Sequence, residues 1–358
     1  MPKKICFVAL RAYPLIAKMD RVYGGGPEVL QTILGSKLLE QGFEVSFVVY
    51  GSSSGKENID GIDIIKVPYG EKSRILKSIF IWKAMKKACA DIYYHHSGAS
   101  PIVALFCGAN KKKFILHIGS DGCLMRRART GVKGYGTWWC DIKFADVIIV
   151  QTNFQKLMLK KNFNRDSFLI RNIFPVKTNF LPTKIIPPTV LWVGAIAHVK
   201  QPWLFLKLAR ELPRVKFQMI GGIEDDGRLY EFIKRESKKI PNLDMLGHIP
   251  FSDVDNYFEK AAILVNTSKF EGYPNAFVQS WNNYTPVVSL NADPDEVICK
   301  YELGFHSRTF EQVVNDVTML LNDEMLRKKM SYNCKRYVEK EHNLTKAIDQ
   351  YKNILSLF

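Results

Sequence analysis

The sequence has no long apolar run, no paired cysteines and no metal-ligand cluster at a strong spacing. No stretch approaches the roughly 18 apolar residues that a membrane-spanning helix requires. The first apolar run, Ile5 to Leu10, is shorter than the core of a secretory signal peptide and meets Arg11, so we expect a β-strand there and a cytoplasmic protein. The 7 cysteines are odd in number and none is spaced as Cys-x-x-Cys, which argues against a disulfide framework and a zinc site.

Acidic residues are scarce in the first half of the chain. Residues 1–180 carry 28 lysines and arginines against 13 aspartates and glutamates, whereas residues 181–358 carry 23 against 22. Nearly the whole net charge of +16 therefore lies in the first half. A basic region of this kind attracts phosphate groups, anionic lipid headgroups or nucleic acid, and charge alone does not choose among them. Because no nucleic-acid recognition motif accompanies the charge, we expect no nucleic-acid partner.

The length and the order of apolar runs predict an α/β protein with two domains. At 358 residues the chain is long for one core and suits two domains of about 150–200 residues. Strand-like runs alternate with helical patterns, which predicts parallel sheets with helices on both faces. We expect strands at 5–10, 44–50, 62–67, 114–118, 146–151, 189–194, 215–220, 243–246, 262–266 and 286–289, and helices at 26–41, 73–90, 100–108, 153–162, 201–211, 227–239, 252–261 and 275–284, with helices only in the last fifty residues.

A break in this alternation marks the expected domain boundary. Residues 172–188 are rich in proline and show little periodicity, so we interpret them as an interdomain linker. We expect Rossmann-like domains at 1–175 and 176–340, with sheets facing each other across a cleft, and a helix at 341–358 packing back on the first domain. Ligands of such sheets bind beyond the carboxyl ends of the strands, so the strand-to-helix turns are the places to search.

Three of these turns carry residues suited to a ligand with phosphate and sugar groups. Gly25 and Gly26 precede a helix, and glycines let backbone N–H groups approach a phosphate; a flexible loop is the open alternative. Lys200 follows a buried strand, where it is either placed to neutralise phosphate or an ordinary solvated lysine. In the third turn Glu271 precedes a helix that begins near Asn275. The carboxylate can bind sugar hydroxyls, and the free N–H groups of the helix N-terminus beside it can bind a diphosphate.

The third turn resembles a family signature. The run Glu271-Gly272-Tyr273-Pro274-Asn275, continued by Thr285-Pro286-Val287-Val288, resembles that of the retaining GT-B enzymes of glycosyltransferase family 4. Further matches occur in order along almost the whole chain: Gly25-Gly26-Pro27-Glu28, Ala145 to Thr152, Arg171-Asn172, Val193-Gly194 with Lys200, and Leu246 to Pro250. The resemblance implies transfer of a hexosyl or related sugar from a nucleoside diphosphate to a glycan or lipid-linked acceptor hydroxyl, as in bacterial surface polysaccharide, lipopolysaccharide or capsule synthesis.

The resemblance also implies a role for each matched residue. Lys200 would neutralise the diphosphate, Glu271 would hold donor-sugar hydroxyls, and Gly25 with Gly26 would pack against the donor phosphate. His117 would contact the transferred sugar, with a packed or capping histidine as the alternative. The catalytic set is thus Glu271, Lys200 and His117, and the other substrate-binding positions are Gly25, Gly26, Gly194, Gly247, His248, Pro250, Gly272, Asn275, Ala276, Phe277 and Gln279. Of these, residues 247–250 would line the nucleobase pocket, and the amides of 275–277 would lie beside the donor.

Two departures from the family pattern put activity in doubt. The second glutamate of the signature is Gln279 here, and its amide can still bond ribose hydroxyls. The family's diphosphate-binding arginine is Ala195, and the loss of such a cation removes an interaction on the order of a few kcal/mol. A degenerate protein that binds nucleotide-sugar or a partner without turnover is therefore the main alternative. A sugar-nucleotide epimerase is a further one, although it lacks an evident acid/base set.

No cofactor and no metal is expected. The run Asp293-Pro294-Asp295 resembles the Asp-x-Asp metal motif of the other large glycosyltransferase fold, but it follows the second-domain helix, so we interpret it as a loop and helix start. Lys200 and helix dipoles would do the work that a divalent ion does elsewhere.

A basic amphipathic helix is predicted at 72–90. Its apolar positions at 75, 76, 79, 80, 82 and 85 share one side at helical spacing, and lysines fill the rest. Lys111-Lys112-Lys113 and Arg126-Arg127-Arg129 add to the positive charge. Two interpretations stay open: a peripheral contact with an anionic membrane, and an ordinary domain helix whose apolar side faces the core.

Overall fold

The chain forms two compact units. The computed structural model describes residues 3–19, 25–70, 73–96, 101–124, 132–178, 181–224 and 227–358. The first unit consists of Met1–Ile173 together with Leu344–Phe358, and the second unit of Phe174–Asn343. The last helix therefore belongs to the first unit. Within the described ranges, none of the helices combines the length and the apolar character that crossing a bilayer requires.

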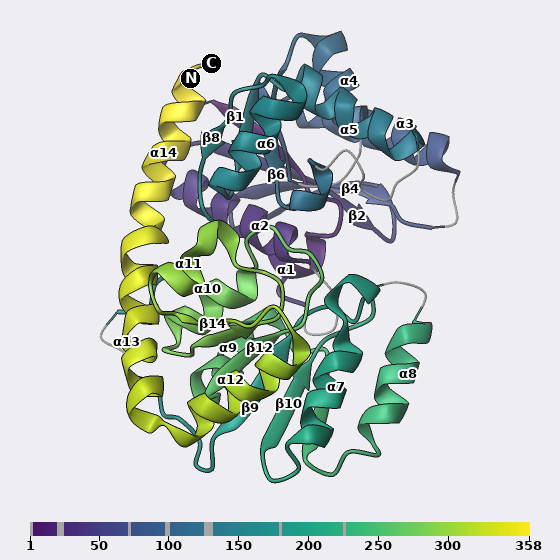
Figure 1. Ribbon diagram of the computed structural model, residues 1–358. Coiled ribbons are helices and arrows are strands. Elements are labelled where there is room, and N and C mark those ends of the chain that lie inside the picture. The colour runs from purple at the N-terminus through teal and green to yellow at the C-terminus, as the bar shows by residue number, and fades with distance from the viewer. Residues whose placement is uncertain are drawn as a thin grey trace. The chain divides into compact units, whose positions relative to one another are not determined.

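The first unit is built on an eight-stranded sheet with the order β3-β4-β2-β1-β5-β6-β7-β8. All neighbouring strands are parallel except β3 and β4, which form an antiparallel hairpin. The strands β5 and β7 are buried at every residue, because helices cover both faces of the sheet (Figure 1). The strands are β1 (Lys4–Val8), β2 (Glu44–Gly51), β3 (Gly55–Ile59), β4 (Ile62–Pro68), β5 (Ile92–His96), β6 (Lys113–Ile118), β7 (Val147–Val150) and β8 (Phe168–Leu169), and the helices are α1 (Tyr13–Ile16), α2 (Gly26–Glu40), α3 (Arg74–Ala88), α4 (Pro101–Asn110), α5 (Val132–Phe144), α6 (Asn153–Phe163) and α14 (Leu344–Ser356).

The second unit is built on a six-stranded sheet with the order β11-β10-β9-β12-β13-β14, in which all pairs are parallel. Its core is formed by apolar residues of the strands together with those of α7, α8 and α12. The strands are β9 (Thr189–Val193), β10 (Lys216–Ile220), β11 (Leu243–Gly247), β12 (Ile263–Asn266), β13 (Val287–Ser289) and β14 (Gly304–His306). The helices are α7 (Pro202–Glu211), α8 (Arg228–Ser237), α9 (Phe251–Lys260), α10 (Asn275–Asn282), α11 (Val297–Lys300), α12 (Phe310–Asn322) and α13 (Glu324–Glu341), with short 3-10 turns at His198–Lys200 and Pro294–Glu296.

The predicted fold class, two α/β units with parallel sheets, is confirmed, but several elements escaped the sequence analysis. The strands β3, β5, β8 and β14 and the helix α5 were not predicted. The most important omission is β5, whose residues Ile92 to His96 include two tyrosines and two histidines. All five residues are buried. The strand was missed because its tyrosines and histidines do not form the apolar run that marks a buried strand.

Two predicted helices differ in detail from the expectation. The helix α9, expected at 252–261, begins at Phe251 with Pro250 as its N-cap and no side-chain cap. In α3 the predicted apolar side is split between core and solvent. Met85 is fully buried, whereas the exposed fraction is 74% for Ile75 and 44% for Ile79. Arg126, Arg127 and Arg129 lie outside the described residues.

The segment expected to be a linker is anchored to the second unit. The Asn282 side-chain amide donates to the carbonyl of Pro175 at 2.9 Å. Lys177 forms an ion pair with Asp255 at 2.7 Å. The Lys184 ammonium donates to the Asn283 carbonyl at 2.8 Å and to Thr285 Oγ1 at 2.6 Å. Residues after Ile173 therefore belong to the folded second unit, and burial lowers the pKa of Lys184 to about 7.

This buried lysine predicts a specific pH dependence of stability. Because the fold disfavours the Lys184 ammonium, the unfolded chain binds more protons between about pH 7 and pH 10.5, and stability rises with pH in that window. We expect the free energy of unfolding to gain at most about 1.4 kcal/mol per pH unit from this group. Urea unfolding between pH 7 and 10 should show a steeper rise for the wild type than for Lys184→Met. The exposed Lys216→Met is the matched control and should keep the wild-type slope; parallel curves for wild type and Lys184→Met would contradict the prediction.

Candidate functional site

A lysine and a glutamate meet at the carboxyl edge of the second sheet. Lys200 ends the turn after β9, and Glu271 lies in the turn after β12, the strand next to β9 in the sheet. Because parallel strands end at the same edge, the two turns lie side by side. The distance from Lys200 Nζ to Glu271 Oε1 is 2.5 Å, and the exposed fractions of the two side chains are 27% and 11%. The structure thus joins two of the three predicted catalytic residues in one half-buried ion pair.

The turn after β12 holds the Glu271 carboxylate in place. Ser268 Oγ donates to Glu271 Oε1 at 2.6 Å, and Asn266 Nδ2 donates to the same oxygen at 3.4 Å. The Asn266 side-chain oxygen, Oδ1, in turn accepts from the Ser268 backbone N–H at 3.1 Å. Among the described residues no hydrogen bond reaches the second carboxylate oxygen, Oε2. One oxygen therefore fixes the side chain, and the other is available to a ligand.

Backbone contacts lock the two turns together. Thr267 Oγ1 donates to the Lys200 carbonyl at 2.7 Å and accepts from Trp192 Nε1 at 3.0 Å. The Lys269 backbone N–H donates to the Val199 carbonyl at 2.8 Å. Trp192 is buried, so the turn after β9 is tied to the core of the unit as well as to the turn after β12. The positions of the lysine and the carboxylate are consequently set by rigid elements.

The helix α10 begins next to Glu271. Its N-cap is Pro274, and Asn275 and Ala276, both half-buried, form its first turn. The Phe277 backbone N–H already donates to the Pro274 carbonyl at 3.1 Å, and its ring is fully buried. Of the three amides predicted beside the donor, that of Phe277 is thus engaged within the helix. The remaining first-turn groups carry the partial positive charge that favours anions at a helix N-terminus.

The rest of the signature after Glu271 serves mainly to pack the turn. Gly272 is buried. Tyr273 is buried too, and its hydroxyl lies 2.9 Å from Tyr337 Oη and 3.0 Å from His342 Nε2. Gln279 has an exposed fraction of 8% on α10. The signature therefore combines a ligand-facing carboxylate with buried residues that support it.

Three glycines meet at the same edge, at the ends of β9, β10 and β11. Gly194 N–H donates to the Ile220 carbonyl at 3.0 Å, and Gly221 N–H donates to the Gly247 carbonyl at 2.8 Å. A Cβ on Gly221 would lie 2.1 Å from the Gly194 carbonyl oxygen, and Gly247 has a φ of +72°, which favours glycine. Sequence analysis found Gly194 and Gly247 but missed Gly221. The signal was the Gly221-Gly222 pair directly after a predicted strand.

The predicted nucleobase-pocket residues follow this glycine edge. His248 is half-buried, and burial lowers its pKa below the ordinary value, which favours the neutral ring. Pro250 caps α9. Both residues lie on the chain directly after Gly247, so they are held beside the glycine edge by β11 on one side and α9 on the other.

In the first unit, the predicted residues lie at the carboxyl ends of strands and at the start of α2. Gly25 is the N-cap of α2 with an extended backbone, and Gly26 is the first residue of the helix. A Cβ on Gly25 would lie 2.8 Å from Glu28 Oε2, so the space there is small. His117, near the end of β6, is 2% exposed and stacks on His96 with a ring distance of 3.9 Å. His96 in turn lies near the backbone of Pro27 at the start of α2, which links the two regions.

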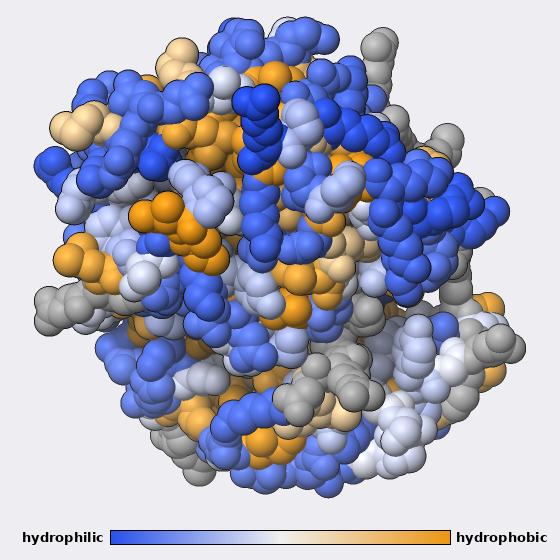
Figure 2. All heavy atoms as spheres, turned by 90° about the horizontal axis from the view of Figure 1, so that it is seen from below, coloured by the Kyte–Doolittle hydropathy of each residue, from blue (hydrophilic) through white to orange (hydrophobic). Residues whose placement is uncertain are grey.

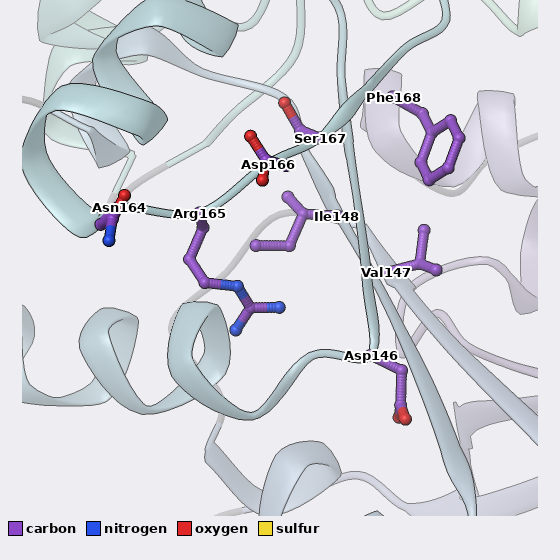
Figure 3. Close-up of a pocket in the computed structure, with 8 residues that line it drawn as sticks. All are labelled: Asp146, Val147, Ile148, Asn164, Arg165, Asp166, Ser167 and Phe168. Carbon is purple, nitrogen blue, oxygen red and sulfur yellow. The ribbon is translucent and has the colours of Figure 1, made fainter.

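A pocket of about 320 Å³ lies elsewhere in the first unit and is not a candidate for this chemistry. It is lined by residues from Asp146 to Ile148 and from Asn164 to Phe168, shown in Figure 3. Asp146 precedes β7, so the pocket opens at the amino end of that strand, away from the ligand edge of the sheet. The Arg165 guanidinium donates to the carbonyls of Ile142 and Lys143, where it caps the end of α5. These contacts give the pocket a structural explanation.

One group of side chains in the second unit has the composition of a metal site. Ligand atoms of Asp293, Cys299 and His306 lie within 4.8 Å of one another. The arrangement is also explained without an ion, because Asp293 accepts from the backbone N–H groups of Ile298 at 2.8 Å and of Cys299 at 3.3 Å. Burial and the nearby Asp293 carboxylate raise the pKa of the Cys299 thiol, which opposes the thiolate that a metal needs. The group fits a cap of the short helix α11.

Exposed hydrophobic side chains of the described residues lie in scattered groups. On the face shown in Figure 2 hydrophilic side chains predominate and hydrophobic ones gather in separate groups. The large exposed apolar residues are likewise spread over both units. A single broad apolar interface is therefore not evident on that face.

Comparison with known proteins finds a family model that matches the part of the chain containing this site. Residues 179–337, which contain Lys200 and Glu271, match the family model "Glycosyl transferases group 1". A curated protein of Haemophilus influenzae named as an uncharacterized glycosyltransferase is 25% identical over 92% of this chain and 96% of its own length. An alpha-1,4-N-acetyl-D-galactosaminyltransferase of Campylobacter jejuni, named for a PP-undecaprenol-linked saccharide, is 27% identical over 41% of this chain and 42% of its own length.

Solved structures agree with the fold. Sucrose-phosphate synthase from Thermosynechococcus elongatus has a TM-score of 0.84 at 15% identity and covers 99% of this chain and 98% of its own. Anabaena HepE, crystallised with UDP and glucose, has a TM-score of 0.75 at 13% identity and covers 99% of this chain and 100% of its own. Both likenesses concern the arrangement of strands and helices. The chain therefore has the GT-B fold, and its residues 179–337 are similar to the group 1 glycosyl transferases.

Proposed function

We propose that this protein is a retaining glycosyltransferase that moves a hexosyl or related sugar from a nucleoside-diphosphate sugar to an acceptor hydroxyl. The observation that carries the proposal is the Lys200–Glu271 pair, which places a cation and a carboxylate 2.5 Å apart beside the start of α10. A cation and a helix N-terminus favour a diphosphate, and a carboxylate oxygen favours sugar hydroxyls. A nucleotide-sugar contains both groups, joined by the bond that the enzyme breaks.

The proposed chemistry needs only groups of the protein and the substrates. The bond from the anomeric carbon to the diphosphate oxygen breaks, and its electron pair stays on the leaving phosphate, where Lys200 stabilises the negative charge. The acceptor oxygen bonds to the anomeric carbon from the side of the departing phosphate, so the configuration is kept. The acceptor proton passes to the leaving phosphate oxygen. Glu271 fixes the sugar through its hydroxyls during this exchange.

The two units are proposed to divide the substrates. The second unit, expected from the sequence at 176–340, would bind the donor mainly, because it contains Lys200, Glu271 and the glycine edge. The basic first unit would bind the acceptor, with His117 reaching the transferred sugar. Anabaena HepE was crystallised with UDP, which supports a uridine-type donor as the first to test. No metal or cofactor is proposed for the transfer.

The acceptor is proposed to be a glycan or a lipid-linked saccharide, in bacterial surface polysaccharide, lipopolysaccharide or capsule synthesis. The name of the Campylobacter jejuni relative, which includes a PP-undecaprenol-linked saccharide, supports a lipid-linked acceptor. We propose a cytoplasmic protein that contacts the inner face of the membrane peripherally. In α3, Ile75 and Ile79 are exposed, and the lysines at 83, 86 and 87 are exposed on the same helix, as a contact with an anionic membrane requires.

Vesicle sedimentation tests this membrane contact. The protein should sediment with vesicles that contain anionic phospholipid and much less with neutral vesicles, since each lysine near the surface adds about 1 kcal/mol. Lys83→Glu with Lys86→Glu should abolish the binding, and Lys234→Glu with Lys238→Glu in the second unit is the charge-matched control. Equal sedimentation of the two double variants would contradict the contact through α3.

Thermal shifts test the donor site directly. The purified protein is heated with UDP-, GDP-, ADP- and CMP-sugars and their free nucleotides, without metal, alongside Glu271→Ala and Lys200→Ala. A ligand that binds only the folded state adds about 2.7 kcal/mol to the free energy of unfolding at a hundredfold excess over Kd. The melting temperature rises accordingly. We expect one nucleotide family to stabilise the wild type and both variants to lose most of the effect. Lys216→Ala, which removes an exposed ion pair with Asp244, is the control and should respond like the wild type.

A second function, nucleotide-sugar binding without turnover, follows from two residues. Ala195 and Gln279 stand where the family has an arginine and a second glutamate. A thermal shift without any transfer or hydrolysis product would favour this binder. No shift with any nucleotide, in a folded protein, would reject both functions of the donor site.

A further inference from the structure

A short hydrogen bond joins a buried tyrosine to the histidine of the first-unit site. Tyr94 on β5 and His117 on the neighbouring strand β6 are each 2% exposed. The distance from Tyr94 Oη to His117 Nδ1 is 2.5 Å. The Tyr94 ring packs against Phe7 at 5.0 Å, so the hydroxyl has little freedom to turn away. The contact is thus a fixed feature of the core.

The chemistry of the two groups decides which one donates. Burial lowers the pKa of His117 to about 3, so its ring is neutral and offers one donor and one acceptor nitrogen. A phenol is a better proton donor than a neutral imidazole, and an imidazole nitrogen is the better acceptor. Tyr94 therefore donates to Nδ1, and the proton of the His117 ring lies on Nε2.

The Nε2 atom of His117 has no partner within the described part of the chain. It is buried and makes no hydrogen bond there. An unpaired buried donor costs about 1–3 kcal/mol, so it is expected to meet an acceptor in the working protein. The ring is held parallel to His96, at an angle of 4°, and His96 lies near the backbone of Pro27 at the start of α2. The donor is thus held in a region that also contains the Gly25–Gly26 turn.

We infer that Tyr94 is a positioning residue: it fixes the tautomer of His117 so that Nε2–H donates a hydrogen bond to an oxygen of the transferred sugar. This inference rests on the proposed function of His117. The other tautomer would present a lone pair at Nε2 and would accept from a hydroxyl instead. The tyrosine therefore decides whether the histidine acts as a donor or as an acceptor toward the ligand.

The C-terminal helix completes this arrangement. Tyr351 on α14 is 3% exposed, and its hydroxyl lies 3.4 Å from Tyr94 Oη. A hydroxyl that donates to Nδ1 can still accept a hydrogen bond, so Tyr351 is placed to donate to Tyr94. The last helix of the chain thereby supports a residue that is 257 positions earlier in the sequence. This contact gives α14 a role in the site of the first unit beyond covering its core.

Nitrogen-15 NMR of histidine-labelled protein measures the tautomer without any activity assay. The His117 signals, assigned by their loss in His117→Gln, should show a protonated Nε2 and a non-protonated Nδ1 in the wild type. In Tyr94→Phe the signals should shift toward a mixture of tautomers. Tyr93→Phe is the matched control, because Tyr93 is a buried neighbour that donates instead to the Met85 carbonyl at 2.7 Å. It should leave the His117 signals unchanged.

Kinetics then separate positioning from folding. We expect Tyr94→Phe to lower kcat about tenfold, the loss of one hydrogen bond of about 1.4 kcal/mol, with KM for the donor nearly unchanged, and Tyr93→Phe to leave kcat within twofold. A protonated Nδ1 in the wild type, or an unchanged tautomer in Tyr94→Phe, would overturn the inference. Absence of transfer in the wild type with a confirmed Nε2–H tautomer would instead reject the proposed function and leave the role of Tyr94 toward His117 intact.

Discussion

Replacement of Glu271 by alanine is expected to lower kcat/KM for sugar transfer by about 10²–10³-fold, because a preorganised hydrogen-bonding group at a reacting centre contributes about 2.7–4 kcal/mol. The structure supports so large an effect. One carboxylate oxygen is held by Lys200 and Ser268, at 2.5 Å and 2.6 Å, so the side chain is oriented before the donor arrives. Its other oxygen is the one available to sugar hydroxyls. Initial-rate kinetics with the donor identified by thermal shift provide the measurement.

The Lys200 partner allows a sharper form of this test. Because the two charges are in contact, the effects of Glu271→Ala and Lys200→Ala should not add in the double variant. Glu236→Ala is the control: Glu236 also takes part in ion pairs, with Arg210 and Lys239 on the surface of the second unit, and its loss should leave kcat/KM within twofold. Full activity of Glu271→Ala would reject the proposed site. Additive losses would show that the ion pair does not couple the two residues in catalysis.

Gly221→Ala is expected to destabilise the second unit by about 3 kcal/mol and to abolish nucleotide binding. The new Cβ would lie 2.1 Å from the Gly194 carbonyl oxygen, a backbone atom that cannot rotate away. The ends of β9 and β10 would have to separate. Because Gly194 and the turn that carries Lys200 come directly after β9 in the chain, this separation would displace both. Urea unfolding gives the stability change, and the thermal shift with the preferred nucleotide gives the binding.

A second glycine provides the control for this substitution. Gly108 on α4 has open space where a Cβ would be placed, so Gly108→Ala should be neutral or slightly stabilising, as alanine favours a helix. A Gly221→Ala protein as stable as Gly108→Ala would show that the two strand ends part easily. If Gly221→Ala were destabilised yet bound nucleotide with wild-type affinity, the glycine edge would not be part of the donor site.

The candidate site was largely predictable because its residues lie in local patterns. Lys200 and Glu271 each follow a short apolar strand, and parallel strands end at one edge, so the sequence placed both at the ligand-binding edge of a sheet. That their strands, β9 and β12, are neighbours came from the structure. Gly221 could have been found by the same rule. The engagement of the Phe277 amide with Pro274 could not, because it depends on how tightly the first turn of α10 winds.

The strand β5 shows the limit of sequence patterns. Tyr93, Tyr94, His95 and His96 give no apolar run, so the strand was missed and with it the partner of His117. Burial of such residues is stabilised where their polar atoms find partners on other elements. Tyr94 lies near Tyr351 and His95 bonds the Val8 carbonyl, both distant in the sequence, and Tyr93 donates to Met85 on the preceding helix.

The sequence by itself determined the alternation of strands and helices, the turns that carry Lys200 and Glu271, and the excess of positive charge in the first half. These features depend on neighbours within a few residues, which the periodicity of a strand or helix connects directly. The tertiary structure alone decided that residues after Ile173 are anchored to the second unit. It also decided which nitrogen of His117 is bonded. These outcomes depend on contacts between segments far apart in the chain. Such contacts form only when each sheet has assembled with its helices and water has been excluded from the buried polar groups.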